Sequence, residues 1–238
     1  MDLNVVIEDC GSRDNNQMIR HKLDRCKALG FHTVALSVVI ELQNTSPQVP
    51  LPPEVPIVNQ LKVYTRLTVK ISDSQQLYKL ETCEETSKYD ILALDPQNAT
   101  MLQYLITKCD KFDILTLDVS QKLDYSLFKM NYKALEDRGI CVEINWGPSQ
   151  LGSSLRRNII CNGQNLVEKV NKNIIISSGV RDVFRFRGPK DVKSLSVLFM
   201  LPTNKCHEAV FRNGTRVINH SKCRVNPISS AIELVAPD

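Results

Sequence analysis

Residues 173–192, NIIISSGVRDVFRFRGPKDV, decide the fold of this chain. They begin with Ile174-Ile175-Ile176, an uninterrupted apolar run that is typical of a parallel strand buried on both faces. The run ends at Ser177-Ser178-Gly179. Gly188-Pro189 closes the loop that follows, and Asp191 is placed to cap the next helix. This order of strand, loop and helix predicts one βα unit of a parallel sheet.

The same alternation runs along most of the chain. The predicted strands are 3–7, 33–39, 62–71, 89–94, 113–119, 140–144 and 173–178, and the predicted helices are 15–29, 74–83, 97–108, 131–138, 153–172, 191–201 and 204–212, with a short last helix near 215–219. Seven βα units predict an α/β fold, a seven-stranded parallel β/α barrel forming a single domain over residues 1–238. Because the chain has neither a GxGxxG motif nor a P-loop, a barrel is favoured over an open nucleotide-binding sheet.

Residues 43–60 interrupt this alternation. Their five prolines are Pro47, Pro50, Pro52, Pro53 and Pro56. A helix or a central strand does not tolerate this density of proline, so we expect an exposed, partly polyproline II excursion in place of the helix between the second and third strands. A flexible insertion and a docking segment for a partner protein fit the pattern equally well.

The composition favours an intracellular protein without a membrane segment. Hydrophobic residues make up 42% of the 238 residues, which is enough for a sizeable core. The eight cysteines are scattered with no CxxC pair, which favours reduced, buried thiols over a zinc site or a disulfide framework. No N-terminal signal and no bilayer-spanning run is present.

The positive charge is concentrated in the C-terminal part of the chain. Residues 1–149 contain 16 Lys and Arg against 20 Asp and Glu, whereas residues 150–238 contain 14 against 6. A polyanionic partner would therefore meet the C-terminal part. A solvated basic face explains the same asymmetry equally well.

The predicted carboxyl ends of the strands do not offer a catalytic set. Asp95 and Asp118 have the chemistry of an acid/base pair, but capping of the following helices is favoured. The four histidines are His21, His32, His207 and His220. None ends a strand, which leaves no metal ligand set and no base for a nucleophile. We therefore predict no catalytic residue, no metal site and no cofactor, and we interpret Trp146 as an anchored loop aromatic.

A constellation of basic residues is the main candidate site. Arg156 and Arg157 open the long predicted helix, whose N-terminus attracts anions. The next βα loop carries Arg181, Arg185, Arg187 and Lys190. Since neighbouring barrel loops lie close together, we expect one surface that holds phosphates, for which guanidinium groups are well suited. In the alternative interpretation, Arg187 pairs with a carboxylate such as Glu143 or Asp118.

Two further features bear on this surface. The interleaved aromatic residues are limited to Phe184 and Phe186, which favours recognition of the nucleic-acid backbone over base stacking. Further basic residues that can extend the surface are Lys193, Arg212, Arg216, Lys222 and Arg224.

Short motifs in a fixed order resemble one protein family. They are Asp2-Leu3-Asn4, Thr65-Arg66-Leu67-Thr68, Ser154-Leu155-Arg156-Arg157, Ile175-Ile176-Ser177-Ser178 and Arg187-Gly188-Pro189-Lys190-Asp191-Val192. Over nearly the whole chain, this ordered set resembles the thirty-kilodalton protein subunit of ribonuclease P and of the related ribonuclease MRP.

The resemblance implies a barrel of the polymerase-and-histidinol-phosphatase type without its metal-dependent active site, because Asp2-Leu3-Asn4 stands where such enzymes carry HxH. It implies a noncatalytic RNA-binding subunit of a ribonucleoprotein whose RNA removes the 5′ leader from precursor tRNA, with ribosomal RNA processing in the MRP particle. The implied partners are the catalytic RNA, precursor tRNA indirectly, a small ferredoxin-like protein subunit and other ribonuclease P proteins. The nucleus and the nucleolus are the implied location.

The motifs also imply residue roles. Arg156, Arg157 and Arg187 match the family motifs and are expected to contact RNA. Arg66 also matches, but its place inside a strand indicates an internal ion pair. Two other functions are retained as alternatives. One is a metal-dependent phosphoesterase on the same barrel, and the other is a barrel that only binds proteins.

Overall fold

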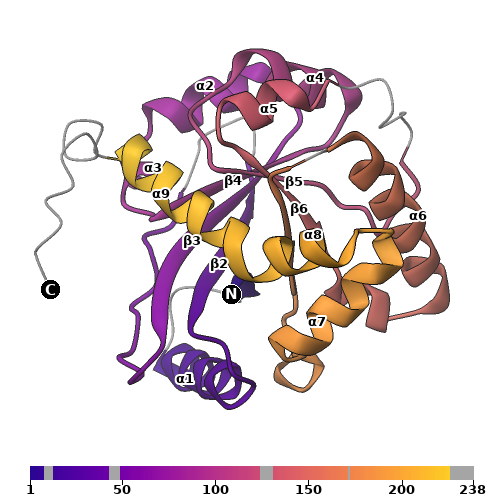
Figure 1. The fold of residues 1–238 in the computed structure, drawn as a ribbon. Helices are drawn as coiled ribbons and strands as arrows, with labels where there is room; N and C mark the ends of the chain where they lie inside the picture. The colour runs from indigo at the N-terminus through magenta and orange to yellow at the C-terminus, as the bar shows by residue number, and fades with distance from the viewer. Residues whose placement is uncertain (8–12, 43–48, 124–130, 171, 226–238) are drawn as a thin grey trace, which may run out of the picture.

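A computed structural model of the chain shows seven parallel strands in a nearly closed barrel surrounded by helices (Figure 1). The structure describes residues 1–7, 13–42, 49–123, 131–170 and 172–225. The strands are β1 (Asp2–Val6), β2 (Thr33–Glu41), β3 (Lys62–Ile71), β4 (Ile91–Pro96), β5 (Ile114–Thr116), β6 (Cys141–Asn145) and β7 (Ile174–Ser177). They lie side by side in chain order, and each neighbouring pair is parallel. The predicted fold class and all seven strands are confirmed.

The barrel closes between β1 and the segment that follows β7. Val5 pairs with Val180 in a parallel bridge. The backbone N–H of Gly179 donates to the carbonyl of Asn4 at 3.0 Å, and the N–H of Val6 donates to the carbonyl of Val180 at 3.3 Å. These bonds satisfy the edge groups of β1 that an open sheet would leave exposed.

Helices and short helical turns cover the outside of the barrel. The helices are α1 (Arg13–Ala28), α2 (Ser74–Thr82), α3 (Glu84–Ser87), α4 (Ala99–Lys108), α5 (Lys133–Asp137), α6 (Ser153–Lys169), α7 (Pro189–Ser196), α8 (Thr203–His207) and α9 (Asn213–Val225). The turns are η2 (Gly147–Gln150), η3 (Val183–Arg185), η4 (Val197–Phe199) and η5 (Glu208–Arg212). Among the described residues, no helix has both the length and the hydrophobicity to span a bilayer.

Three predicted helix ends are wrong. Asn213-Gly214 begins α9 instead of ending a helix, so the last helix is longer than expected. Gly214 is used for close packing there, because a Cβ on it would lie 2.9 Å from the sulfur of Met1. Gly152 caps α6, which ends at Lys169 instead of residue 172, and Gly188 caps α7, where Asp191 was expected. Pro189 follows Gly188 at the first helical position, which suits its fixed φ angle.

The described part of the connection between β2 and β3 contains no helix. Residues 49–61 carry no helix or strand, as the prolines predict, whereas residues 43–48 lie outside the described part of the chain. The Tyr89 hydroxyl donates to the carbonyl of Pro50 at 3.0 Å. Val49 is buried, while Ile57 is 90% exposed. The excursion is therefore tied to the barrel near its beginning and exposed further on.

The amino-terminal end of the barrel is filled and covered. An apolar layer inside it consists of Leu3, Ala35, Ile91, Ala93, Ile114, Cys141, Ile175 and Val217. Val217 belongs to α9, which runs across the strands (Figure 1). Asp113, just before β5, binds His220 at 2.7 Å and Arg224 at 3.0 Å. These contacts fix α9 over this end, so ligands are expected at the carboxyl ends of the strands.

The described cysteines are unpaired thiols. Cys26, Cys109, Cys141 and Cys206 are buried, Cys83 is half-buried, and Cys161 and Cys223 are exposed. Burial raises the pKa of the Cys109 thiol to about 11 and that of Cys141 to about 12. Both thiols are therefore protonated and unreactive at neutral pH. Cys10 lies outside the described residues.

Candidate functional site

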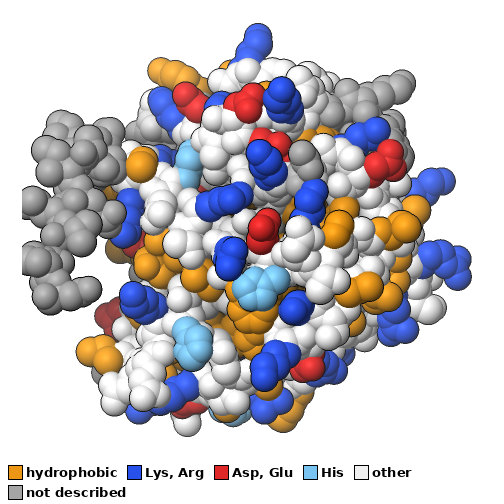
Figure 2. Space-filling view, viewed as in Figure 1, with side chains coloured by type: hydrophobic (Ala, Val, Ile, Leu, Met, Phe, Trp, Pro, Cys, Tyr) orange, Lys and Arg blue, Asp and Glu red, His pale blue; other side chains and the backbone are white. Residues whose placement is uncertain are grey.

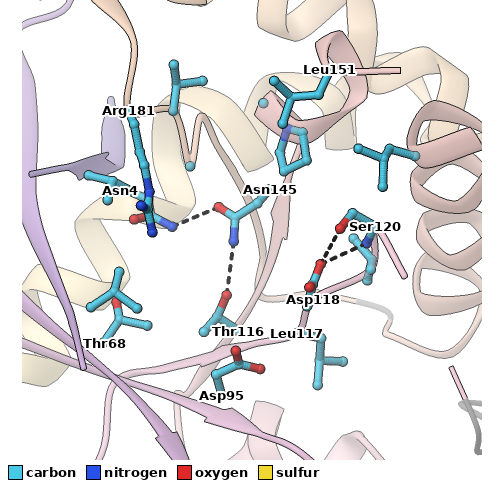
Figure 3. A pocket seen from close by; sticks show the side chains of 18 of the residues that line it. Asn4, Thr68, Asp95, Thr116, Leu117, Asp118, Ser120, Asn145, Leu151 and Arg181 are labelled. Carbon is cyan, nitrogen blue, oxygen red and sulfur yellow. Dashed lines mark hydrogen bonds between the residues drawn. The ribbon is translucent and has the colours of Figure 1, made fainter. Parts of the chain in front are cut away.

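The carboxyl ends of the strands surround a pocket of about 440 Å³ that is lined by both polar and apolar side chains (Figure 3). This volume lies within the range of about 300–1,000 Å³ that is typical of small-molecule sites. At its floor, the Asn4 amide donates to Asn145 Oδ1 at 2.9 Å, and the Asn145 amide donates to Thr116 Oγ1 at 3.0 Å. Three neighbouring regions of the barrel are thereby held in one hydrogen-bonded network.

A buried ion pair lies below this floor. The Arg66 guanidinium donates from Nη1 to Glu143 Oε1 at 2.6 Å and from Nη2 to Glu143 Oε2 at 2.7 Å. Arg66 also donates to the carbonyl of Leu3 at 2.8 Å and to Thr68 Oγ1 at 2.9 Å. Neither side chain of the pair is exposed. The internal ion pair predicted for Arg66 is confirmed, and its two charges compensate each other inside the barrel.

The ion pair determines the charge of Glu143. Burial alone raises the pKa of this carboxyl, but the Arg66 charge and the hydrogen bonds from Arg66 outweigh burial and hold the pKa below its ordinary value. Asn4 and Asn145 donate to the same carboxylate at 3.3 and 3.2 Å. Glu143 is therefore an anion that is fully engaged inside the protein and takes no part in the pocket above.

Asp95 and Asp118 both line the pocket, but neither caps a helix as predicted. Asn98 caps α4, and the Asp118 carboxylate accepts hydrogen bonds from the N–H and hydroxyl of Ser120. Burial and, to a smaller extent, the negative charge of Asp118 raise the pKa of Asp95 to about 7, although Gln97 and Lys70 oppose this shift. Asp95 is thus a carboxyl group that titrates near neutral pH.

We expect Asp95→Asn to stabilise the protein above pH 7 and to change stability little near pH 4. The folded-state pKa of Asp95 lies above its unfolded value of 3.8. Ionisation of Asp95 therefore lowers the free energy of unfolding by roughly 2–4 kcal/mol as the pH rises from about 4 to about 7. Urea unfolding of both proteins at several pH values measures the difference. A difference that stays constant with pH would contradict this assignment, and Asp118→Asn, which removes the repulsion, should reduce the pH dependence.

The histidines lie away from the pocket lining. His220 is bound to Asp113 on the covered side of the barrel, and His207 stacks against Phe211 with ring centroids 4.8 Å apart. In the part of the chain that the structure describes, no group of three or more His, Cys, Asp or Glu side chains is arranged to hold a metal ion.

Two of the predicted arginines, Arg156 and Arg185, bind the turn η2. Arg185 donates from Nη1 to the carbonyl of Gln150 at 3.2 Å, and the Gln150 amide donates back to the carbonyl of Arg185 at 2.9 Å. Arg156 donates from Nε to the carbonyl of Ser149 at 3.0 Å. Gly147 makes this turn possible, because a Cβ there would lie 2.3 Å from the Ser178 carbonyl. The loops after β6 and β7 are therefore neighbours, as the barrel topology predicted.

The six cations do not form one cluster. Arg181 and Arg185 line the pocket at the strand ends, and Figure 3 shows Arg181 beside Asn4. Arg156 and Arg187 line a smaller pocket between α6 and α7, with exposed Arg157 next to Arg156 on α6. Lys190 lines a third pocket, between α7 and α8. The surface is therefore a strip that runs from the barrel mouth toward α8.

Two alternatives about basic residues are decided by the contacts. Glu143 is bound to Arg66, so the alternative in which Arg187 pairs with Glu143 is wrong. Arg187 is exposed and donates to the carbonyls of Phe184 and Phe186. Arg216 and Arg224 do not extend the strip, because they bind Asn173 and Asp113 at the starts of β7 and β5. Lys and Arg side chains are nevertheless spread over the face around α7, α8 and α9 (Figure 2).

The chain is a parallel β/α-barrel protein with a buried ion pair inside the barrel and a strip of arginines beside its mouth. A sequence model of the family "RNase P subunit p30" matches residues 1–226. The chain therefore belongs to the RNase P subunit p30 family.

Curated relatives agree with this assignment. The Ribonuclease P protein subunit p30 of Mus musculus is 28% identical over 87% of this chain and 81% of its own length. The Probable ribonuclease P protein subunit 3 of Schizosaccharomyces pombe is 30% identical over 94% of each. The Protein GAMETOPHYTE DEFECTIVE 1 of Arabidopsis thaliana is 33% identical over 69% of this chain, which spans only 28% of that relative.

Solved structures share the fold. A chain in a cryo-EM structure of archaeal Ribonuclease P with mature tRNA superposes with a TM-score of 0.66, at 12% identity, over 99% of both chains. Histidinol phosphate phosphatase from Lactococcus lactis, in complex with zinc, L-histidinol and phosphate, superposes with a TM-score of 0.51 at 11% identity, over 84% of this chain and 92% of the other. The barrel is therefore of the type that the sequence motifs implied.

Proposed function

We propose that this chain is a noncatalytic protein subunit of ribonuclease P and of ribonuclease MRP that binds the RNA of these particles. Its direct partners would be the catalytic RNA, a small ferredoxin-like protein subunit and other ribonuclease P proteins, with precursor tRNA contacted indirectly. The reactions supported are removal of the 5′ leader from precursor tRNA and processing of ribosomal RNA. This role places the protein in the nucleus and nucleolus.

One observation supports the RNA-binding role most strongly. Among the described residues, the guanidinium groups of Arg156 and Arg187 have no carboxylate partner. Both bind only backbone carbonyl oxygens, and no Asp or Glu within the described ranges lies within salt-bridge distance of either group. Guanidinium groups left in this state match phosphate oxygens bidentately. Further positive charge on the same strip comes from Arg157, Arg181, Arg185 and Lys190. Because the chain belongs to the RNase P subunit p30 family, we propose RNA as the anionic partner.

Capture of the tagged chain from a nuclear extract tests this proposal. We expect the catalytic RNAs of both particles, together with other ribonuclease P proteins, and we expect recovery of RNA to fall as salt rises because bound phosphates release counterions. Capture of proteins without either RNA would favour a protein-binding barrel. Phosphoesterase activity of the isolated chain would favour the alternative enzyme, although the described residues provide no metal-binding group for it.

A further inference from the structure

A second pocket lies between α6 and the α7–η4 segment, and binding of phosphates alone does not explain its aromatic lining. Its volume is about 190 Å³. The rings of Trp146 and Phe199 line it, together with Ile159 and Leu198. This volume is below the usual range for drug-sized ligands, so the pocket suits a single flat group better than a whole cofactor.

The charge at this pocket is positive and uncompensated. Arg156 and Arg187 are among its lining residues, and none of its lining residues is Asp or Glu. The long helix α6 begins beside it with no side-chain cap and no acidic residue in its first turn, so its N-terminal N–H groups add to the attraction for anions. The preferred occupant therefore combines an apolar, flat part with negative charge.

Trp146 supplies an independent observation. Its indole side chain is one of the lining residues although it is only 3% exposed, so the surrounding structure holds it in a fixed position. A rigid indole is a suitable neighbour for a flat ring in the pocket.

We propose that this pocket receives one unstacked base of a single-stranded RNA segment, with the flanking phosphates held by Arg156 and Arg187. The proposal rests on the RNA-binding function and specifies its ligand as single-stranded RNA read partly through a base. A nucleotide brings a flat ring and a phosphate on either side. An acidic side chain of a protein would bring one carboxylate and no flat ring. Base recognition here differs from the backbone recognition that Phe184 and Phe186 suggested in the sequence.

Tryptophan fluorescence tests the proposal directly, because Trp146 is the only tryptophan of the chain. The full chain is titrated with a short oligoadenylate and with an abasic ribose-phosphate chain of the same length. We expect only the oligoadenylate to quench the fluorescence and to bind roughly tenfold more tightly, since stacking of one base contributes on that scale. Binding of both chains with equal affinity and no quenching would refute the base pocket while leaving RNA binding intact. Failure of both to bind would count against the RNA-binding function itself.

A matched pair of variants locates the effect. Leu198→Glu places a carboxylate in the pocket, whereas Val197→Glu adds the same charge one residue earlier, on a side chain that lines the α7–α8 pocket. Both positions are about half-exposed, so the fold should tolerate either change. We expect Leu198→Glu to abolish the preference for oligoadenylate and Val197→Glu to retain it. If Leu198→Glu instead binds oligoadenylate like the unchanged chain but loses a co-purifying protein, the pocket belongs to a protein partner and the proposal is wrong.

Discussion

Replacement of Arg66 by methionine is expected to destabilise the barrel by about 3–5 kcal/mol, because it leaves the Glu143 carboxylate buried without its counter-charge. Arg66 is fully buried and makes two hydrogen bonds to Glu143, one to Leu3 and one to Thr68. The other donors to Glu143 are neutral: the amides of Asn4 and Asn145 and the hydroxyls of Thr116 and Ser177. They cannot replace the charge of a guanidinium.

The pH dependence distinguishes this cause from simple loss of packing. Without Arg66, burial would raise the pKa of Glu143, so the variant should be least stable at high pH and recover in part at acidic pH, where Glu143 is protonated. Urea unfolding at pH 5 and pH 8 measures this. The double variant Arg66→Met with Glu143→Leu removes both charges and should be more stable than the single variant at pH 8. An equal loss in the single variant at both pH values would show that the ion pair is not responsible.

The sequence predicted the barrel well because its strands are rich in apolar and β-branched residues. Ile174–Ser177 is an apolar run that is buried throughout, and Lys62–Ile71 keeps Val, Leu and Ile between its polar residues, so residue type specifies both strands locally. Helix ends were harder to predict. Gly152 and Gly188 are the caps because the backbone is extended at these residues just before each helix. At Gly214 the helix continues because the glycine packs against Met1, which is more than two hundred residues away in the sequence.

The candidate site was predicted in part. The neighbourhood of Arg156 and Arg185 follows from the order of the strands, so sequence was sufficient to place both at η2. The partner of Arg66 was not predictable, since Glu143 is 77 residues away and several carboxylates were equally plausible from the sequence. The near-neutral pKa of Asp95 likewise depends on burial and on the position of Asp118, which only the folded barrel determines.

The double substitution Arg156→Ala with Arg157→Ala is expected to weaken binding of the ribonuclease P RNA by roughly 10- to 100-fold at moderate salt, because two charged donors to phosphate are lost. Both side chains are exposed on the first turns of α6, and Arg156 makes a single side-chain contact to the Ser149 carbonyl. The fold should therefore be unaffected. Filter binding over a range of salt concentrations measures the affinity and its salt dependence together.

The slope of log affinity against log salt separates a phosphate contact from an indirect effect. Loss of two phosphate contacts should flatten the slope by roughly 1.4–1.8, whereas a distant loss of charge should change it little. Lys62→Ala with Lys88→Ala is the matched control, since it removes the same charge from exposed residues near the amino-terminal ends of β3 and β4. If both double variants lose affinity equally and with the same slope, the RNA responds only to net charge. If the control keeps the full slope and the arginine variant does not, the start of α6 lies against the RNA backbone.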